Sequence, residues 1–212
     1  SNARLPANDK NTALLAAKAY AKAAGLTDAY HIYITKNIPV GAGLGGGSAD
    51  AAAVLIALNE RYGALTREEL LALGLSIGAD VPFFLDPRPS LGEGIGDRLR
   101  PVALARDLSL VLVNPGFPVP VAWSYANLGR VPRPAPPDCA VLLAALGAGD
   151  LAGIARGTYN ALEYAVRDKF PLLDLLRDAM LAAGCVAVAV SGSGPTLFGL
   201  VAGDSAPVAA AL

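Results

Sequence analysis

A glycine-rich run at residues 38–52, IPVGAGLGGGSADAA, constrains the fold more than any other stretch of the sequence. It stands directly before a segment whose apolar side chains recur at helical spacing. That spacing predicts a helix with Ser48 as its N-cap, Tyr62 at its end and Gly63 after it. Glycines let backbone N–H groups approach an anion closely, and a helix N-terminus favours negative charge. The run therefore predicts an anion-binding loop, because a flexible connector would not lead into a capped helix.

Two better-known phosphate motifs fit this run less well. Residues 41–46 have the GxGxxG spacing of a dinucleotide-binding turn, which requires a buried apolar strand before it and an acidic residue about 20 positions later. Here residues 31–35 alternate between polar and apolar and are predicted to form a half-buried strand, and Pro39 separates them from the glycines. The acids near the required distance, Glu68 and Glu69, fall in a helical pattern. The Walker A motif fails because no Lys-Ser/Thr pair follows the glycines.

The remaining chain mixes helices and strands without a regular βαβ alternation, which favours an α+β fold. Helices are predicted over residues 11–24 and 66–73, the second of them capped by Thr66. Strands are predicted over residues 108–113, 186–190 and 196–201, with a proline-rich loop over 131–138 and a tight turn, SGSG, at 191–194. We predict two domains, residues 4–107 and 108–212.

Composition excludes several classes of protein. Apolar residues make up 54% of the 212, but the longest apolar runs fall well short of the roughly 20 residues that cross a bilayer. The formal net charge of −1 comes from interspersed acids and bases, which argues against nucleic-acid binding. Cys139 and Cys185, with one histidine, make neither a disulfide framework nor a zinc pattern, so both are expected to be packing residues in a reducing compartment. We expect a soluble cytoplasmic protein, monomeric or homodimeric.

At residues 39–49 the sequence PVGAGLGGGSA resembles the phosphate loop of the GHMP kinase superfamily, P-x-x-x-G-L-G-S/G-S/G-A/S. The superfamily is named for galactokinase, homoserine, mevalonate and phosphomevalonate kinases. Three further segments agree with it in order and spacing: GADVPFF at 78–84, GEGIGD at 92–97 and SGSGPTLF at 191–198. The third glycine followed by SADAA is most similar to the branch that phosphorylates a cytidine-diphosphate-linked methylerythritol.

The resemblance implies a two-domain GHMP kinase fold, with an N-terminal domain like domain 2 of ribosomal protein S5 and a ferredoxin-like C-terminal domain. It also implies ATP-dependent phosphorylation, assisted by Mg²⁺, of the 2-hydroxyl of that CDP-linked methylerythritol, a step of the non-mevalonate isoprenoid pathway. Another GHMP small-molecule kinase, of the homoserine or mevalonate type, is the nearest alternative. A truncated nucleotide-binding module without catalytic activity is the alternative from a different class.

The resemblance also assigns roles to residues. Asp80, in GADVP, would accept the proton of the attacking hydroxyl, and Ser48 would be a possible Mg²⁺ ligand. Gly192, Ser193 and Gly194 would lie beside the substrate. The ATP phosphates would lie on the glycine loop, which we define as Pro39, Val40, Gly41, Ala42, Gly43, Leu44, Gly45, Gly46, Gly47, Ser48 and Ala49.

Two parts of the family pattern are not found in this sequence. The family's second proton-handling residue is a lysine in a P-A-K-x-N-L segment, and neither Lys10 nor Lys18 stands in such a segment. Residues 1–3, SNA, are typical of an expression scar and lead straight into Arg4, so we expect either a truncated chain that lacks the first strands of the family fold or a longer chain whose lysine segment is not given in this sequence. The Ser/Thr pair usual after Asn-Pro-Gly is replaced by Pro120 and Val121.

For the remaining polar and aromatic candidates we expect structural roles. Lys36 is predicted to be a surface charge, and Asp50 to complement the helix N-terminus while pointing away from the phosphates. The polar face of residues 31–35, which carries His31 and Tyr33, is expected to be solvated. Trp123 and Tyr125 are predicted to belong to the core.

Overall fold

The computed structural model describes residues 11–27 and 29–212, and the chain divides into two compact units. The first, which we call the N-terminal unit, holds residues up to Val40 and then Gly45–Pro101. The second, the C-terminal unit, holds Gly41–Leu44 and Val102–Leu212. The SNA segment and the predicted domain start at residue 4 lie outside the described residues. The division into residues 4–107 and 108–212 stays a prediction.

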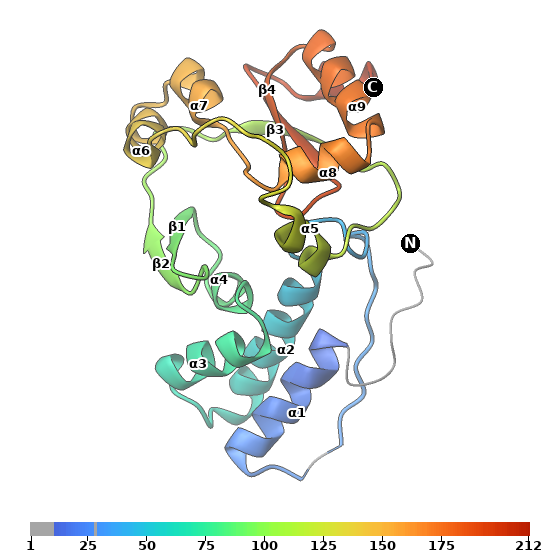
Figure 1. The fold of residues 1–212 in the computed structure, drawn as a ribbon. Coiled ribbons are helices and arrows are strands. Elements are labelled where there is room, and N and C mark those ends of the chain that lie inside the picture. The colour runs from blue at the N-terminus through green and yellow to red at the C-terminus, as the bar shows by residue number, and fades with distance from the viewer. Residues whose placement is uncertain (1–10, 28) are drawn as a thin grey trace. The chain divides into compact units, whose positions relative to one another are not determined.

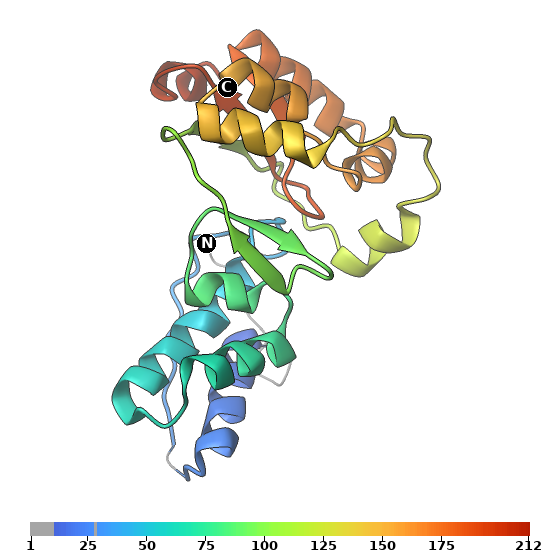
Figure 2. The same cartoon turned by 90° about the vertical axis from the view of Figure 1, so that its left-hand side faces the viewer.

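The N-terminal unit is a group of helices with one β-hairpin, and Figures 1 and 2 both show the first two helices side by side. The hairpin strands pair antiparallel, with Ser90 opposite Pro101 and Glu93 opposite Arg98. The elements, in chain order, are α1 (Thr12–Ala24), α2 (Gly46–Tyr62), α3 (Arg67–Ile77), α4 (Val81–Leu85), β1 (Ser90–Glu93) and β2 (Arg98–Pro101).

Local signals set several limits of these helices, among them the predicted Gly25, Gly63 and Thr66. The side chain of Asn11 accepts hydrogen bonds from the first-turn N–H groups of α1, and Gly25 ends that helix in the left-handed conformation. Thr66 and Glu69 form a reciprocal capping box at α3, and Gly63 terminates α2. The core of the unit joins α1, α2 and α4 through small and medium side chains, which allow close approach: Ala16, Tyr20, Ala51, Ala52, Leu55 and Val81.

Two predictions in this unit are wrong. Residues 31–35 form no strand, because a strand needs a neighbour for its backbone hydrogen bonds, and in the described part of this unit β1 and β2 pair only with each other. Ser48 is not the N-cap of α2, because the helix already begins at Gly46, with Gly45 as its N-cap. Because the helix includes Gly46 and Gly47, the Ser48 hydroxyl lies inside its first turn.

The C-terminal unit is built around an antiparallel sheet in the order β3-β5-β4. The three predicted strands are confirmed, with register pairs Val113–Leu197 and Val190–Leu197. Its elements are β3 (Ser109–Val113), α5 (Val121–Asn127), α6 (Cys139–Ala148), α7 (Leu151–Gly157), α8 (Glu163–Lys169), α9 (Leu172–Ala182), β4 (Cys185–Val190), β5 (Leu197–Val201) and α10 (Ala206–Ala210).

Each face of this sheet packs on different helices. One buried cluster joins sheet residues such as Val111 and Leu197 to Leu173 and Met180 of α9. The other joins Leu200 and its neighbours to α6 and α7. A register shift in β4 after Cys185 lets that side chain share the α9 face with Val190, although strict alternation would separate them. In the described residues, no helix is both long and apolar enough to span a membrane.

The two cysteines differ in exposure, which corrects the expectation that both pack in the core. Cys185 is buried, and that burial raises the pKa of its thiol, whereas Cys139 is exposed at the start of α6. We therefore expect an alkylating reagent at neutral pH to modify Cys139 rapidly and Cys185 only after unfolding. Mass spectrometry of native and denatured samples measures this, and two rapid modifications in the native sample would contradict the burial of Cys185.

Candidate nucleotide-binding and catalytic site

The glycine loop has a backbone that only glycine adopts readily at three alternate positions. Gly41, Gly43 and Gly45 have φ angles of 68°, 75° and 67°, all in the left-handed region. Gly43 is also enclosed, since a Cβ built there would lie 2.2 Å from the carbonyl oxygen of Ser191. The glycines of this motif are therefore required by conformation and by space.

Three successive carbonyl oxygens of the loop, those of Gly41, Ala42 and Gly43, accept hydrogen bonds from donors in the C-terminal unit. The oxygen of Gly41 accepts from the N–H of Val119 at 3.3 Å. The oxygen of Ala42 accepts from the N–H of Thr196 at 3.2 Å, and that of Gly43 from the Ser191 hydroxyl at 2.9 Å. Three successive carbonyl groups are thus fixed by partners from the same unit.

The N–H groups of the loop show the opposite pattern. Among the described residues, none of the N–H groups from Gly41 to Ser48 donates a hydrogen bond. Those of Gly46, Gly47 and Ser48 belong to the first turn of α2, where a helix has no internal acceptor for them and its dipole favours an anion. Bound carbonyls and free N–H groups are the arrangement that a phosphate requires.

The second half of the loop is packed tightly within the N-terminal unit. A Cβ on Gly45 would lie 2.8 Å from the ring of Phe84, and one on Gly46 would lie 3.1 Å from the Nζ atom of Lys36. The hydroxyl of Thr12 donates to the carbonyl oxygen of Gly47 at 2.7 Å. Helices α1 and α4 thus both contact the start of α2.

Lys36 is not the surface charge that the sequence suggested. It is only 8% exposed, and its Nζ atom donates to Oδ2 of Asp50 at 2.5 Å. Asp50, which is 27% exposed, offsets the cost of burying the ammonium group. This pairing places a cation next to Gly46. Sequence reasoning missed it because the two residues share no motif and are joined only by the packing around α2.

We expect Lys36→Met to lower the free energy of unfolding by about 2 kcal/mol, since it leaves the partly buried Asp50 carboxylate without this partner. The control is Arg67→Met, which breaks the ion pair between Arg67 and Asp86 on the surface of the same unit. That variant should change stability by about 0.5 kcal/mol or less. Chemical denaturation of both measures the difference, and equal losses would argue against a special environment for Lys36.

Asp80 occupies the N-cap position of α4, in the same unit as the second half of the loop. The next two residues, Val81 and Pro82, are buried, and Val81 joins the core with α2. Val81 is the first residue of α4 and Pro82 the second. Asp80 itself is exposed, and its carboxylate has no hydrogen-bond or ion-pair partner among the described residues. The buried residues anchor the helix, while the carboxylate stays available to a ligand.

The predicted SGSG turn, Ser191–Gly194, connects β4 to β5 and contacts the first half of the glycine loop. A Cβ on Gly192 would lie 3.2 Å from the carbonyl oxygen of Gly43. Gly192 is exposed, whereas Ser193 and Gly194 are buried, and the carbonyl oxygen of Ser193 accepts from the Ser124 hydroxyl at 3.1 Å. The structure therefore brings together two glycine segments that are far apart in the sequence.

The aromatic candidates lie elsewhere. His31 and Tyr33 are exposed, Tyr33 at 93%. Trp123 is partly buried against Phe170, as predicted, but Tyr125 is 62% exposed, so its assignment to the core is wrong. Tyr125 faces solvent because α5 buries Ser124 and Asn127 instead.

The residues present fit a magnesium ion that arrives with a nucleotide. Within residues 11–27 and 29–212, no group of three or more His, Cys, Asp or Glu side chains is placed to hold a metal ion. Mg²⁺ in phosphate-transfer sites is held largely by phosphates and water, with one or two protein oxygens. The Ser48 hydroxyl, in the first turn of α2, is an oxygen donor of that kind.

Comparison with known proteins agrees with the geometry. The family model of the GHMP kinases N terminal domain matches residues 11–86, and that of the GHMP kinases C terminal matches residues 142–212. The chain belongs to the GHMP kinases, a family of small-molecule kinases that use ATP as the phosphate donor, and it has their two-domain α+β fold.

Within that family the chain is similar to one kind of enzyme in particular. It is 42% identical to the 4-diphosphocytidyl-2-C-methyl-D-erythritol kinase of Geobacter sp. (strain M21), over 98% of this chain and 72% of the relative. A crystal structure of 4-(cytidine 5'-diphospho)-2C-methyl-D-erythritol kinase superposes with a TM-score of 0.78 at 40% identity, covering 94% of this chain and 72% of that one. The homoserine kinase of Cytophaga hutchinsonii gives the same TM-score at 25% identity, covering 97% and 71%.

Proposed function

We propose that this protein transfers the γ-phosphoryl group of ATP to the 2-hydroxyl of 4-diphosphocytidyl-2-C-methyl-D-erythritol. The observation that carries the kinase assignment is the glycine loop, in which the carbonyl groups of Gly41–Gly43 are bound while the N–H groups from Gly41 to Ser48 have no acceptor among the described residues. The choice of acceptor alcohol is supported by the similarity to the Geobacter and crystallised relatives. A place in the non-mevalonate isoprenoid pathway follows from that acceptor.

In the proposed reaction the glycine loop, residues 39–49, binds the phosphates of ATP. Its N–H groups and the N-terminus of α2 stabilise the negative charge on the transferring group. Lys36 supplies the positive charge that a Walker lysine would otherwise provide, because its Nζ atom lies beside Gly46. The proposed phosphate site therefore combines the neutral donors of the loop with the ammonium group of Lys36, which is paired with Asp50.

We propose that Asp80 is the general base. As the alcohol oxygen attacks the γ-phosphorus, its proton passes to the Asp80 carboxylate. At the same time the bond between the γ-phosphorus and the β,γ-bridging oxygen breaks, and ADP leaves with that oxygen. An exposed carboxylate without an internal partner is suited to accept that proton. Mg²⁺, held by the phosphates with Ser48 as a candidate ligand, would neutralise phosphate charge. Gly192, Ser193 and Gly194 are the proposed contacts to the substrate.

A coupled assay of ADP release tests the proposal with each alcohol offered separately. We expect turnover with the CDP-linked methylerythritol and none with homoserine or mevalonate. Turnover with homoserine alone would overturn the choice of acceptor while keeping the kinase. ATP binding without turnover of any of the three alcohols would favour a nucleotide-binding module. Native mass spectrometry of the same sample distinguishes the monomer from the homodimer.

A further inference from the structure

The SGSG turn is poorly able to hold its own shape. Gly192 and Gly194 have φ angles of 54° and 79°, so the turn depends on two residues with little intrinsic conformational preference. Within the turn, the N–H of Gly194 bonds the carbonyl oxygen of Ser191 at 2.9 Å, and the N–H of Ser191 bonds that of Thr196 at 2.8 Å. Other contacts must fix the remaining backbone groups.

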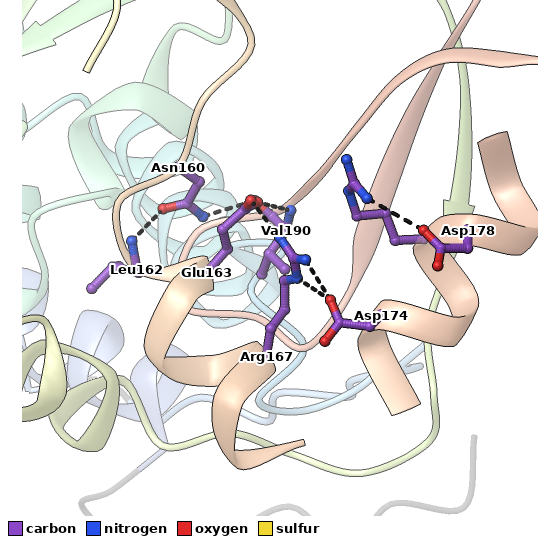
Figure 3. A network of polar contacts seen from close by, with 8 residues as sticks. Asn160, Leu162, Glu163, Arg167, Asp174, Asp178 and Val190 are labelled. Carbon is purple, nitrogen blue, oxygen red and sulfur yellow. Dashed lines mark hydrogen bonds and ion pairs between the residues drawn. The ribbon is translucent and has the colours of Figure 1, made fainter. Parts of the chain in front are cut away.

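Asn160, just before α8, supplies two of these contacts through one amide nitrogen. Its Nδ2 atom donates to the carbonyl oxygens of Val190 and Gly192, both at 2.8 Å. Its Oδ1 atom accepts from the N–H of Leu162 at 2.9 Å, which fixes the amide orientation (Figure 3). Both amide hydrogens are therefore used to join the end of β4 to the exposed glycine of the turn.

Glu163, the first residue of α8, completes the attachment. Its Oε2 atom accepts from the N–H of Val190 at 3.1 Å, while Oε1 pairs with Arg167 at 3.2 Å. Arg167 in turn donates through Nε to Asp174 at 2.6 Å, which links α8 to α9 (Figure 3). Glu163 is 8% exposed, and the salt bridge to Arg167 compensates its buried charge. Both backbone groups of Val190 thus bond side chains near α8.

The SGSG turn, held by Asn160 and Glu163, bonds directly to the glycine loop. The Ser191 hydroxyl donates to the carbonyl oxygen of Gly43, and the N–H of Thr196 donates to that of Ala42. A Cβ on Gly43 would lie 2.9 Å from the nitrogen of Gly194, so the two backbones touch without an intervening side chain. A shift of the turn would therefore release the carbonyl groups of the loop, and a free carbonyl oxygen repels a phosphate.

We infer that Asn160 and Glu163 are positioning residues for nucleotide binding: they hold the SGSG turn, and the turn keeps the carbonyl groups of Ala42 and Gly43 away from the phosphates. This role rests on the proposed function, because it needs the glycine loop to be the phosphate site. Asn160 precedes α8 and Glu163 begins it, and neither residue belongs to a glycine motif. We nevertheless expect both to affect the affinity for ATP. Neither residue touches the reacting atoms.

The variant Asn160→Asp tests the inference with little change in size. It retains an oxygen for the N–H of Leu162 but replaces the donor with an oxygen that faces two carbonyl oxygens. The matched control is Asn59→Asp at the far end of α2. Asn59 accepts from Tyr20 and donates to the carbonyl oxygen of Leu65, so the same chemistry is broken away from both glycine segments.

Three measurements on the full chain decide the matter: thermal stability, the Kd for a non-hydrolysable ATP analogue with Mg²⁺ by calorimetry, and hydrogen exchange of the segment 190–197. We expect both variants to melt at lower temperature. Only Asn160→Asp should raise the Kd, by about tenfold or more. Only that variant should speed exchange at Thr196, whose N–H reports the contact with Ala42. An unchanged Kd with a loosened turn, or equal Kd changes in both variants, would overturn the inference.

Two further outcomes are informative. If Asn160→Asp does not fold, Ser191→Ala takes its place, because it removes only the hydroxyl that bonds Gly43. That variant should weaken analogue binding by about fivefold, and wild-type affinity would overturn the inference. A wild-type protein that binds the analogue but does not phosphorylate the CDP-linked alcohol would refute the proposed substrate alone. A wild-type protein without measurable affinity for the analogue would overturn both.

Discussion

Replacing Asp80 by asparagine should lower kcat by about 10²- to 10⁴-fold while leaving the KM for ATP nearly unchanged. The amide keeps the size of the side chain and the N-cap position of α4 but cannot accept the proton of the attacking hydroxyl. Because the carboxylate makes no hydrogen bond among the described residues, its loss should hardly alter stability. Steady-state kinetics with the CDP-linked alcohol, together with a thermal melt, measure both effects.

Asp86→Asn is the matched control for that experiment. Asp86 lies at the opposite end of the same short helix, where it pairs with Arg67 and Arg88 on the surface. These two arginines hold the pKa of the Asp86 carboxyl below its usual value, with the hydrogen bond to Arg88 contributing most. The control should retain wild-type kcat. A full kcat in Asp80→Asn would remove Asp80 from the mechanism, and an equal loss in both variants would point to the helix as a whole.

Gly43→Ala should abolish measurable nucleotide binding and lower the melting temperature. An alanine at φ 75° is strained by about 1–2 kcal/mol, and here its methyl group would also lie 2.2 Å from a backbone oxygen of the SGSG turn. Neither backbone can avoid the other by a rotamer change, so the loop and the turn must separate. Calorimetric titration with the non-hydrolysable ATP analogue measures the loss, which we expect to exceed about 100-fold in Kd.

Gly63→Ala separates backbone strain from the clash. Gly63 ends α2 at φ 60°, but nothing lies within 4 Å of a Cβ built there. This variant should lose about 1 kcal/mol of stability and bind the analogue as the wild type does. If Gly43→Ala bound the analogue as well as Gly63→Ala does, close contact between the loop and the turn would not be needed for binding.

The elements that the sequence predicted correctly, α1 to α3 and β3 to β5, are those whose signals are local. Capping residues such as Thr66 and terminal glycines such as Gly63 act within one turn, and the apolar runs of β3, β4 and β5 reflect a sheet that packs on helices at both faces. Residues 31–35 misled the same reasoning, since their alternation is typical of a strand but a strand also needs a neighbour.

Only the residues of the site that belong to sequence motifs could be predicted. Glycine-rich spacing indicated an anion-binding loop, but not which of its backbone groups are free. That depends on contacts such as Ser191 to Gly43, which joins residues 148 positions apart. Lys36 was misjudged for a similar reason, because its burial is decided by Asp50 and by the packing of α2. Asn160 and Glu163 carry no motif that would mark them before the fold is known.

The bound carbonyl groups of Gly41–Gly43 affect the free energy of nucleotide binding. Ordering a flexible backbone costs about 1–2 kcal/mol per residue, and a loop that is already held by its partners avoids that cost when the ligand arrives. The backbone of the loop is therefore preorganised for its ligand. ATP and ADP should then associate at rates set by diffusion and charge, and the preference for one over the other should come from contacts to the terminal phosphate.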